Sequence, residues 1–182
     1  IVKPLLSEGY FESITIDQNR LFSQIIDNLN KASAVGFSPE TISNRLKSAW
    51  GGKPGQEIVY EQAQDCALRF RQYCLDNNLL DFSLQLYLFA NHIWPSYIAK
   101  TFLTQTYRHL IYDNIEEDIP VAHDIIREWL PGFETALILF DEQAGYRAFL
   151  GADPDSASGI KNETSQSIQL DRSFTGSATI HL

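Results

Sequence analysis

Residues 107–114 read YRHLIYDN, an apolar run that closes on the acid Asp113 and on Asn114. A helical pattern covers residues 120–130, and a second apolar run, TALILF at 135–140, closes on the polar triplet DEQ. Two parallel strands need a crossover connection, so this strand-helix-strand order predicts a parallel sheet. The carboxyl ends of parallel strands meet at one edge, and we expect any chemistry to lie there.

The length and composition of the chain predict a globular protein. Its 182 residues, of which 44% are hydrophobic and 12% aromatic, are enough for a packed core. The longest apolar stretches, at 84–94 and 135–140, are too short to cross a bilayer, and no charged-then-apolar leader opens the chain. A soluble, cytoplasmic protein is therefore expected. The chain begins with Ile and has no Met, which indicates an excised or processed fragment.

The charge is unevenly distributed along the chain. The formal net charge of −9 argues against a general binder of polyanions. Residues 1–80 carry eight basic and nine acidic side chains, whereas residues 81–182 carry six and fourteen, so the acidity belongs to the second half. Between residues 31 and 53 the balance is reversed, because four basic residues accompany one acid: Lys31, Arg45, Lys47 and Lys53, with Glu40.

The cysteines, the histidines and the glycine-rich loop match no metal-binding or phosphate-binding motif. Cys66 and Cys74 lie eight residues apart in a helical pattern, which predicts plain buried thiols and neither a metal knuckle nor a disulfide framework. The four histidines show no paired-ligand spacing. The loop GGKPG at 51–55 fails the GxxxxGK[ST] pattern of a phosphate-binding loop, since Pro54 follows the Lys.

Helical periodicity dominates up to the first strand. Apolar spacings of three and four, with caps and breakers at their ends, predict helices at about 20–31, 41–50, 57–77, 81–94 and 97–105. After the second strand, the sequence predicts a short segment at 147–150, a loop at 155–166 and a further strand at 167–170.

Asp113 is the candidate metal ligand, and two interpretations of it stay open. An acid at the end of a buried parallel strand is well placed to hold Mg²⁺ beside a nucleotide phosphate. Alternatively, Asp113 caps the helix beyond it, and Glu116, Glu117 and Asp118 form a solvated acidic turn at the positive end of that helix. The spacing alone favours neither.

Polar and aromatic residues follow the second strand. Gln143 places an amide near the same edge, and Tyr146 and Phe149 lie just beyond it. Aromatic side chains on a groove can stack nucleic-acid bases at roughly 1 to 3 kcal/mol per base. Aromatics with this spacing are more often part of the core, and both interpretations are kept.

Four segments follow one another in a recognisable order: residues 73–84 (YCLDNNLLDFSL), 112–118 (YDNIEED), 138–154 (ILFDEQAGYRAFLGADP) and 170–175 (LDRSFT). In this order they resemble segments of UvrD/Rep/PcrA-type superfamily 1 DNA helicases. The first resembles the segment before the Walker B strand, the second lies where the family has motif II, VDEFQDT, the third resembles motif III, and the fourth resembles the motif LxxNYRS. The resemblance implies an α/β fold, with an incomplete RecA-like, P-loop NTPase-type parallel sheet core after a mainly helical N-terminal subdomain.

The resemblance also implies domains and roles. Residues 1–80 correspond to the end of the inserted helical subdomain and residues 81–182 to part of the ATPase core. Asp113 corresponds to the Mg²⁺ acid and Gln143 to the residue that couples the ATP phosphate to DNA, while Tyr146 and Phe149 correspond to the base-stacking platform. ATP and Mg²⁺ are expected in the full-length parent and not bound to this fragment. The expected partners are single-stranded or forked DNA, contacted also by the four basic residues above, and other repair proteins, with no membrane.

Departures from the family pattern leave two readings of the activity. Asn114 stands where the family has its catalytic Glu, and a neutral amide cannot take a proton from the attacking water. Thr175 stands where the LxxNYRS motif of the family has its Arg, and Leu150 stands near the position of the motif III Arg. The chain is then either a piece of a divergent helicase or a helicase-like scaffold without catalysis. A weaker third interpretation, a receiver-like sheet with Asp113 as phosphoacceptor, lacks an acidic pair on an earlier strand.

Overall fold

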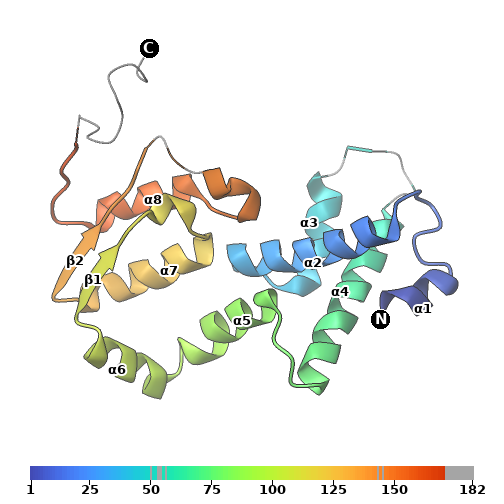
Figure 1. Cartoon of the computed structure of the whole chain (residues 1–182), viewed down its shortest axis with the longest axis horizontal. Helices are drawn as coiled ribbons and strands as arrows, with labels where there is room; N and C mark the ends of the chain where they lie inside the picture. Colours follow the sequence, from blue (N-terminus) through green and yellow to red (C-terminus); the bar gives the residue numbers. More distant parts are fainter. Residues whose placement is uncertain (50, 53–54, 56, 143, 145, 171–182) are drawn as a thin grey trace, which may run out of the picture.

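The computed structural model describes residues 1–170 except 50, 53–54, 56, 143 and 145 (Figure 1). The α-helices are α1 (Val2–Ser7), α2 (Gln18–Val35), α3 (Ile42–Ala49), α4 (Ile58–Asp76), α5 (Phe82–Leu88), α6 (Tyr97–Thr106), α7 (Pro120–Trp129) and α8 (Pro154–Gly159). The strands are β1 (His109–Tyr112) and β2 (Thr135–Ile138). Short helical segments are η1 (Pro39–Thr41), η2 (Phe89–Ile93), η3 (Ile115–Glu117), η4 (Leu130–Gly132), η5 (Tyr146–Leu150) and η6 (Ile160–Glu163).

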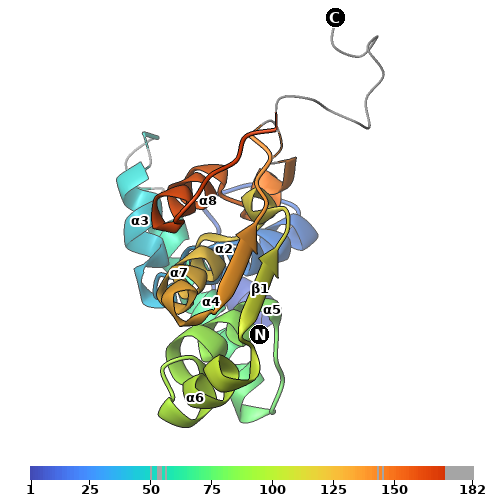
Figure 2. The ribbon, with the colours of Figure 1, turned by 90° about the vertical axis from the view of Figure 1, so that its left-hand side faces the viewer.

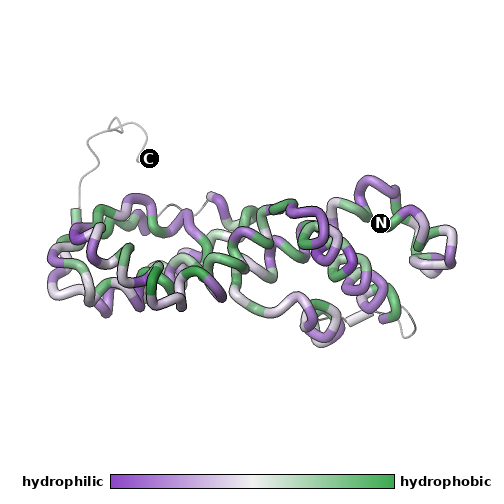
Figure 3. The backbone as a smooth tube through the Cα atoms, turned by 90° about the horizontal axis from the view of Figure 1, so that it is seen from below, coloured by the Kyte–Doolittle hydropathy of each residue, from purple (hydrophilic) through white to green (hydrophobic). Residues whose placement is uncertain are grey.

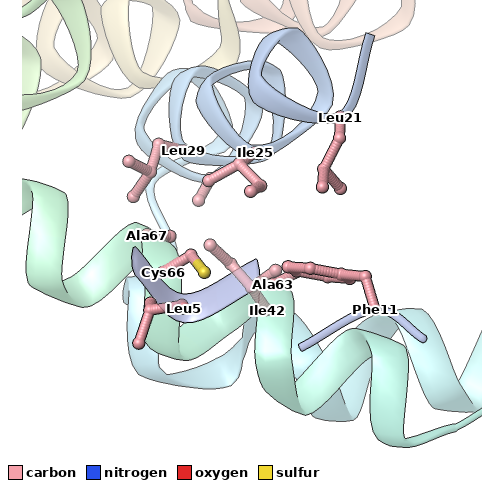
Figure 4. Packing of buried hydrophobic residues seen from close by; sticks show 10 residues of the cluster. Leu5, Phe11, Leu21, Ile25, Leu29, Ile42, Ala63, Cys66 and Ala67 are labelled. Carbon is pink, nitrogen blue, oxygen red and sulfur yellow. The ribbon is translucent and has the colours of Figure 1, made fainter. Parts of the chain in front are cut away.

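The first part of the chain, from α1 to α4, packs around α2 and α4. The carboxylate of Asp17 accepts from the N–H groups of Asn19 and Arg20 and begins α2, and Gly36 ends it at φ 86° in the left-handed region. The helical spacing places one apolar stripe of α2 against α4, and apolar and polar positions mix along the helices (Figure 3). The core of this part, shown in Figure 4, comprises Leu5, Phe11, Leu21, Ile25, Leu29, Ala32, Ile42, Ala63, Cys66 and Ala67.

Both cysteines are buried and free, which confirms the prediction of plain thiols. Burial raises the pKa of the Cys66 thiol to about 11, so this group stays a neutral, apolar part of the core at physiological pH.

The second part of the chain, from β1 to η6, is built on the predicted strand-helix-strand crossover. β1 and β2 pair in parallel with His109 opposite Thr135 and Tyr112 opposite Ile138, and α7 connects them. α7 and α8 lie on the same side of the two strands (Figure 2). A small core of Ile115, Ala157 and Ile160, joined by Tyr112, Leu130 and Ile138, fills this side. Among the described residues no element covers the opposite face, where Ile111 is 75% exposed, and we call it the bare face.

An aromatic cluster joins α6 to α7. The indole N–H of Trp94 donates to Oε2 of Glu128 at 2.7 Å, and Lys100 forms an ion pair with the same carboxylate. The rings of Trp94 and Trp129 lie with centroids 5.2 Å apart, and Phe133 stacks on Trp129. α2 also contacts both α5 and α7, so the two parts of the chain pack against each other.

The predicted RecA-like α/β class is wrong for this structure. Helical segments make up 65% of the described residues, and within these residues the sheet has only the two strands β1 and β2. Two short apolar runs supply two strands, while the apolar stretch at 84–94 follows helical spacing and forms α5 and η2. The predicted strand at 167–170 is also wrong, since the described structure pairs it with no strand and leaves Ile168 and Leu170 exposed.

The division of the chain near residue 80 stays a prediction. Within the part of the chain that the structure describes, no helix combines the length and the apolar character needed to cross a bilayer.

Candidate functional site

The carboxyl ends of β1 and β2 meet at one edge, as the sequence predicts. Beyond the paired residues, the N–H of Leu139 donates to the carbonyl of Tyr112 at 2.8 Å, and the N–H of Ile115 donates to the carbonyl of Leu139 at 3.3 Å. Asn114 lies between these contacts in the left-handed region, at φ 54° and ψ 46°. Asn tolerates this conformation better than most residues, and it turns the chain sharply into η3.

Asp113 is exposed at this edge and does not cap a helix. Asn114 occupies the N-cap position of η3 and Ile119 that of α7, and neither makes a side-chain capping hydrogen bond. The capping interpretation of Asp113 is therefore wrong. Among the described residues, no three side chains of His, Cys, Asp or Glu gather in a way that could hold a metal ion. The role of Asp113 as a Mg²⁺ ligand stays a prediction.

The acidic turn, which we define as residues 114–118, is not a solvated turn. Glu116 is only 1% exposed, and its Oε2 accepts from the N–H of Asp141, which follows β2, at 3.2 Å. Burying a carboxylate is costly unless it is hydrogen-bonded, so this contact gives Glu116 a structural reason to point inward. Sequence reasoning missed this role, because the partner lies 25 residues further along the chain.

Glu117 binds the segment after β2. Its Oε1 accepts from the N–H of Tyr146 and its Oε2 from the N–H of Arg147, each at 3.1 Å. Nε of Arg147 lies 3.5 Å from the same Oε2. The two donors begin η5, where backbone N–H groups have no partner within the helix. The acidic turn therefore caps η5 from outside.

Asp118 ends the acidic turn and accepts hydrogen bonds from residues before and after it. Its Oδ2 accepts from the hydroxyl of Tyr112 at 2.5 Å and its Oδ1 from the N–H of Ile119 at 2.7 Å, while its carbonyl accepts from the N–H of Asp153 at 3.0 Å. Burial, together with the hydrogen bond to Asp118, raises the pKa of the Tyr112 hydroxyl well above its ordinary value. The hydroxyl therefore stays protonated and keeps donating to Asp118.

His123 supports the same turn from α7. It is fully buried, and its Nε2 lies 2.9 Å from the carbonyl of Ile115, so Nε2 carries the proton and donates. Within the described structure its Nδ1 has no hydrogen-bond partner. The sequence gives only a weak signal for this role, since a lone His on a helix is not a metal or catalytic motif.

Tyr146 and Phe149 are surface residues. They are 81% and 74% exposed on η5, and Leu150 beside them is exposed as well. The core interpretation of these aromatics is therefore wrong. Gly151 ends η5 at φ 102°, and a Cβ there would lie 3.5 Å from Cβ of Ala34, which places η5 beside the C-terminal end of α2.

The predicted basic residues lie on the helical part of the molecule. Lys31 on α2 pairs with Asp27 at 2.8 Å, and Lys47 on α3 pairs with Glu61. The guanidinium of Arg45, also on α3, lies 4.1 Å from the centroid of the Phe37 ring. The remaining predicted positions, Lys53, Gln143 and Thr175, lie outside the described residues.

The acidic turn therefore directly follows Asp113 and binds η5, which carries the exposed aromatics. The predicted basic residues lie on other elements. Comparisons with protein-family models, with curated proteins and with solved structures found no match to this chain.

Proposed function

We propose that this chain is part of a divergent UvrD-like, ATP-dependent DNA helicase. In this proposal the edge formed by β1 and β2 meets Mg²⁺-nucleotide in the parent protein, and η5 meets single-stranded DNA. One observation carries the proposal: Glu117, on the acidic turn that directly follows the exposed acid Asp113, binds the backbone of η5, the segment that carries two exposed aromatics. Such an arrangement can connect a phosphate-binding edge to a base-stacking surface.

The chemistry of the edge fits a metal-bound nucleotide better than a bare one. The residues near it include the exposed acids Asp113 and Asp141, whose charge repels an unaccompanied phosphate. Mg²⁺ is commonly held by one or two carboxylates together with phosphate oxygens and water. Asp113 could supply such a carboxylate, and bound Mg²⁺ supplies the positive charge that offsets the phosphates. Nucleotide binding should therefore depend on Mg²⁺.

The η5 aromatics fit single-stranded DNA because they stand free of the core. Every nucleobase has a π-face, so two exposed rings can stack bases without reading sequence. Lys31 and Lys47 can add phosphate contacts, since their surface ion pairs are worth about 0 to 1 kcal/mol each and exchange easily for phosphate. Charge reversal at Lys47 should then weaken DNA binding and reduce its salt dependence.

A scaffold without catalysis is the second candidate, and Asn114 is the observation that favours it. The amide cannot act as a base toward water at the position where the family has Glu. In this case the parent holds nucleotide or DNA within a repair complex without turning nucleotide over.

Fluorescent ATP titrations of the parent protein, with Mg²⁺ and with EDTA, test the nucleotide half. Asp113→Asn should remove the Mg²⁺-dependent binding, whereas Asp155→Asn, which removes the same charge from an exposed position on α8, should leave it unchanged. Anisotropy with oligo(dT) at several salt concentrations tests the DNA half. A parent that binds neither ligand refutes the proposal.

The ATPase rate of Asn114→Glu in the same parent separates the two candidates. A large gain means that the remaining catalytic machinery is intact and supports the helicase. No gain, with nucleotide and DNA still bound, supports the scaffold.

A further inference from the structure

The segment η5 is held mainly through its backbone and not by buried side chains. None of its five residues is buried, and Tyr146, Phe149 and Leu150 are exposed. Most helices in proteins are stabilised by packing of an apolar face, and η5 has no such face. Its placement must therefore depend on polar contacts to its main chain.

Glu117 supplies the contacts from outside the segment. Both of its carboxylate oxygens accept from the first two N–H groups of η5, and the side chain of Glu117 is only 16% exposed. The contacts span 29 and 30 residues of sequence, so they tie η5 to a different element. Hydrogen bonds to a charged acceptor are stronger than neutral ones, especially where solvent is partly excluded.

The base of this contact is buried and hydrogen-bonded. The N–H of Glu117 donates to the carbonyl of Asn114 at 3.0 Å, and its neighbours Ile115 and Glu116 are buried. Glu116 in turn holds the N–H of Asp141. Glu117 is therefore fixed relative to both strands, and it transmits that position to η5.

We propose that Glu117 is a positioning residue that holds η5 so that Tyr146 and Phe149 present their rings to single-stranded DNA. This role rests on the proposed function, because it assigns the exposed rings to DNA. Glu117 touches no base or phosphate itself. Glu117 also forms an ion pair with Arg147. Whether removal of its charge weakens or strengthens DNA binding is therefore informative.

The sign separates a positioning role from a purely electrostatic one. Removal of a carboxylate near DNA relieves repulsion and releases the cation of Arg147, so an electrostatic role predicts tighter binding for Glu117→Gln. A positioning role predicts weaker binding, because an amide can accept at one N–H only and places its NH₂ group against the other.

The experiment uses the full chain with Glu117→Gln, Glu117→Asp and the matched control Glu142→Gln. The control removes the same charge from an exposed site on the same edge. Oligo(dT) binding is measured by anisotropy over a range of salt, and stacking by the fluorescence of 2-aminopurine in the oligonucleotide. Amide hydrogen exchange is measured at Tyr146 and Arg147 without DNA.

We expect Glu117→Gln to weaken oligo(dT) binding roughly fivefold or more, which corresponds to the loss of at least one stacked base, and to reduce the 2-aminopurine signal. Exchange at the two amides should become roughly tenfold faster or more, because their acceptor is lost. Glu117→Asp keeps the charge but shortens the side chain, so it should change both measurements in the same direction. Glu142→Gln should weaken neither binding nor protection.

Tighter or unchanged DNA binding by Glu117→Gln, or unchanged exchange at the two amides, would overturn the positioning role. Protection at Leu29, in the core between α2 and α4, reports whether each variant is folded. If Glu117→Gln does not fold, Glu117→Asp decides by the same criteria. A wild-type chain that binds no oligo(dT) overturns the role of Glu117 in DNA binding, while the exchange data still decide whether Glu117 holds η5. The proposed function itself is decided by the binding measurements on the parent protein.

Discussion

Ile115→Ala should destabilise the part of the molecule that holds the candidate site. Ile115 is fully buried in the small core with Ala157 and Ile160. The substitution removes three carbons, worth about 2.4 kcal/mol at about 0.8 kcal/mol each. A residual cavity of roughly 60 Å³ adds about 1.4 kcal/mol at about 24 cal/mol per Å³, for a total of about 4 kcal/mol.

Ile111→Ala is the matched control for this prediction. It makes the same chemical change four residues earlier, at a side chain that is 75% exposed on the bare face of β1. Loss of a β-branched residue from a strand should cost at most about 1 kcal/mol there. The two variants therefore differ by about 3 kcal/mol in the free energy of unfolding if the burial pattern is correct.

Urea denaturation followed by circular dichroism measures the difference. Amide exchange shows whether the loss is confined to the second part of the chain, with β1 and α8 exposed before the core around Leu29. A difference below about 1 kcal/mol between the two variants would refute the reasoning, because the two sites would then be equivalent in burial.

Three further predictions concern groups around the site and the aromatic cluster. Tyr112→Phe removes the hydroxyl that donates to the acidic turn and should lower the free energy of unfolding by about 1 to 2 kcal/mol in urea titrations. Because folding raises the pKa of this hydroxyl, its contribution is present below about pH 10 and should fade as the pH rises further. Gly151→Ala should cost about 1 to 2 kcal/mol, read from the thermal midpoint, since φ is 102° there. Hydrogen bonds from Lys100 and from Trp94 lower the pKa of Glu128. The contribution of Glu128 to stability is therefore present above about pH 4.3 and is lost as the pH falls through the lower pKa of the folded state. Acid should shift the fluorescence emission of Trp94, and Glu128→Gln should abolish this shift.

The crossover of the second part could be predicted from the sequence because its signals are local. The apolar runs at 107–112 and 135–140 contain β1 and β2, and the helical pattern at 120–130 contains α7, which begins at Pro120. The helix starts at α2 and α5 are local as well, because the side chains of Asp17 and Asp81 accept from the first N–H groups of these helices.

Long-range partners could not be predicted from the same signals. Glu116 and Glu117 look like solvated acids until the N–H groups that they bind, 25 to 30 residues away, are placed beside them. Tyr146 and Phe149 have core-like spacing, but no element in the described part of the chain covers them. The segment at 167–170 has strand-like alternation, yet a strand needs a neighbour, and the described structure pairs it with no strand.

The left-handed backbone at Asn114 affects which residues this position accepts. Asn and Asp adopt φ 54° more readily than other residues with side chains, whereas Glu costs about 1 kcal/mol or more in strain. A carboxylate can therefore be placed here at low strain as Asp but not as Glu. Asn at this position relaxes the turn, whereas Asn114→Glu strains it. Asn114→Asp adds a carboxylate without that strain, so it distinguishes the lack of a catalytic carboxylate from backbone strain caused by Glu.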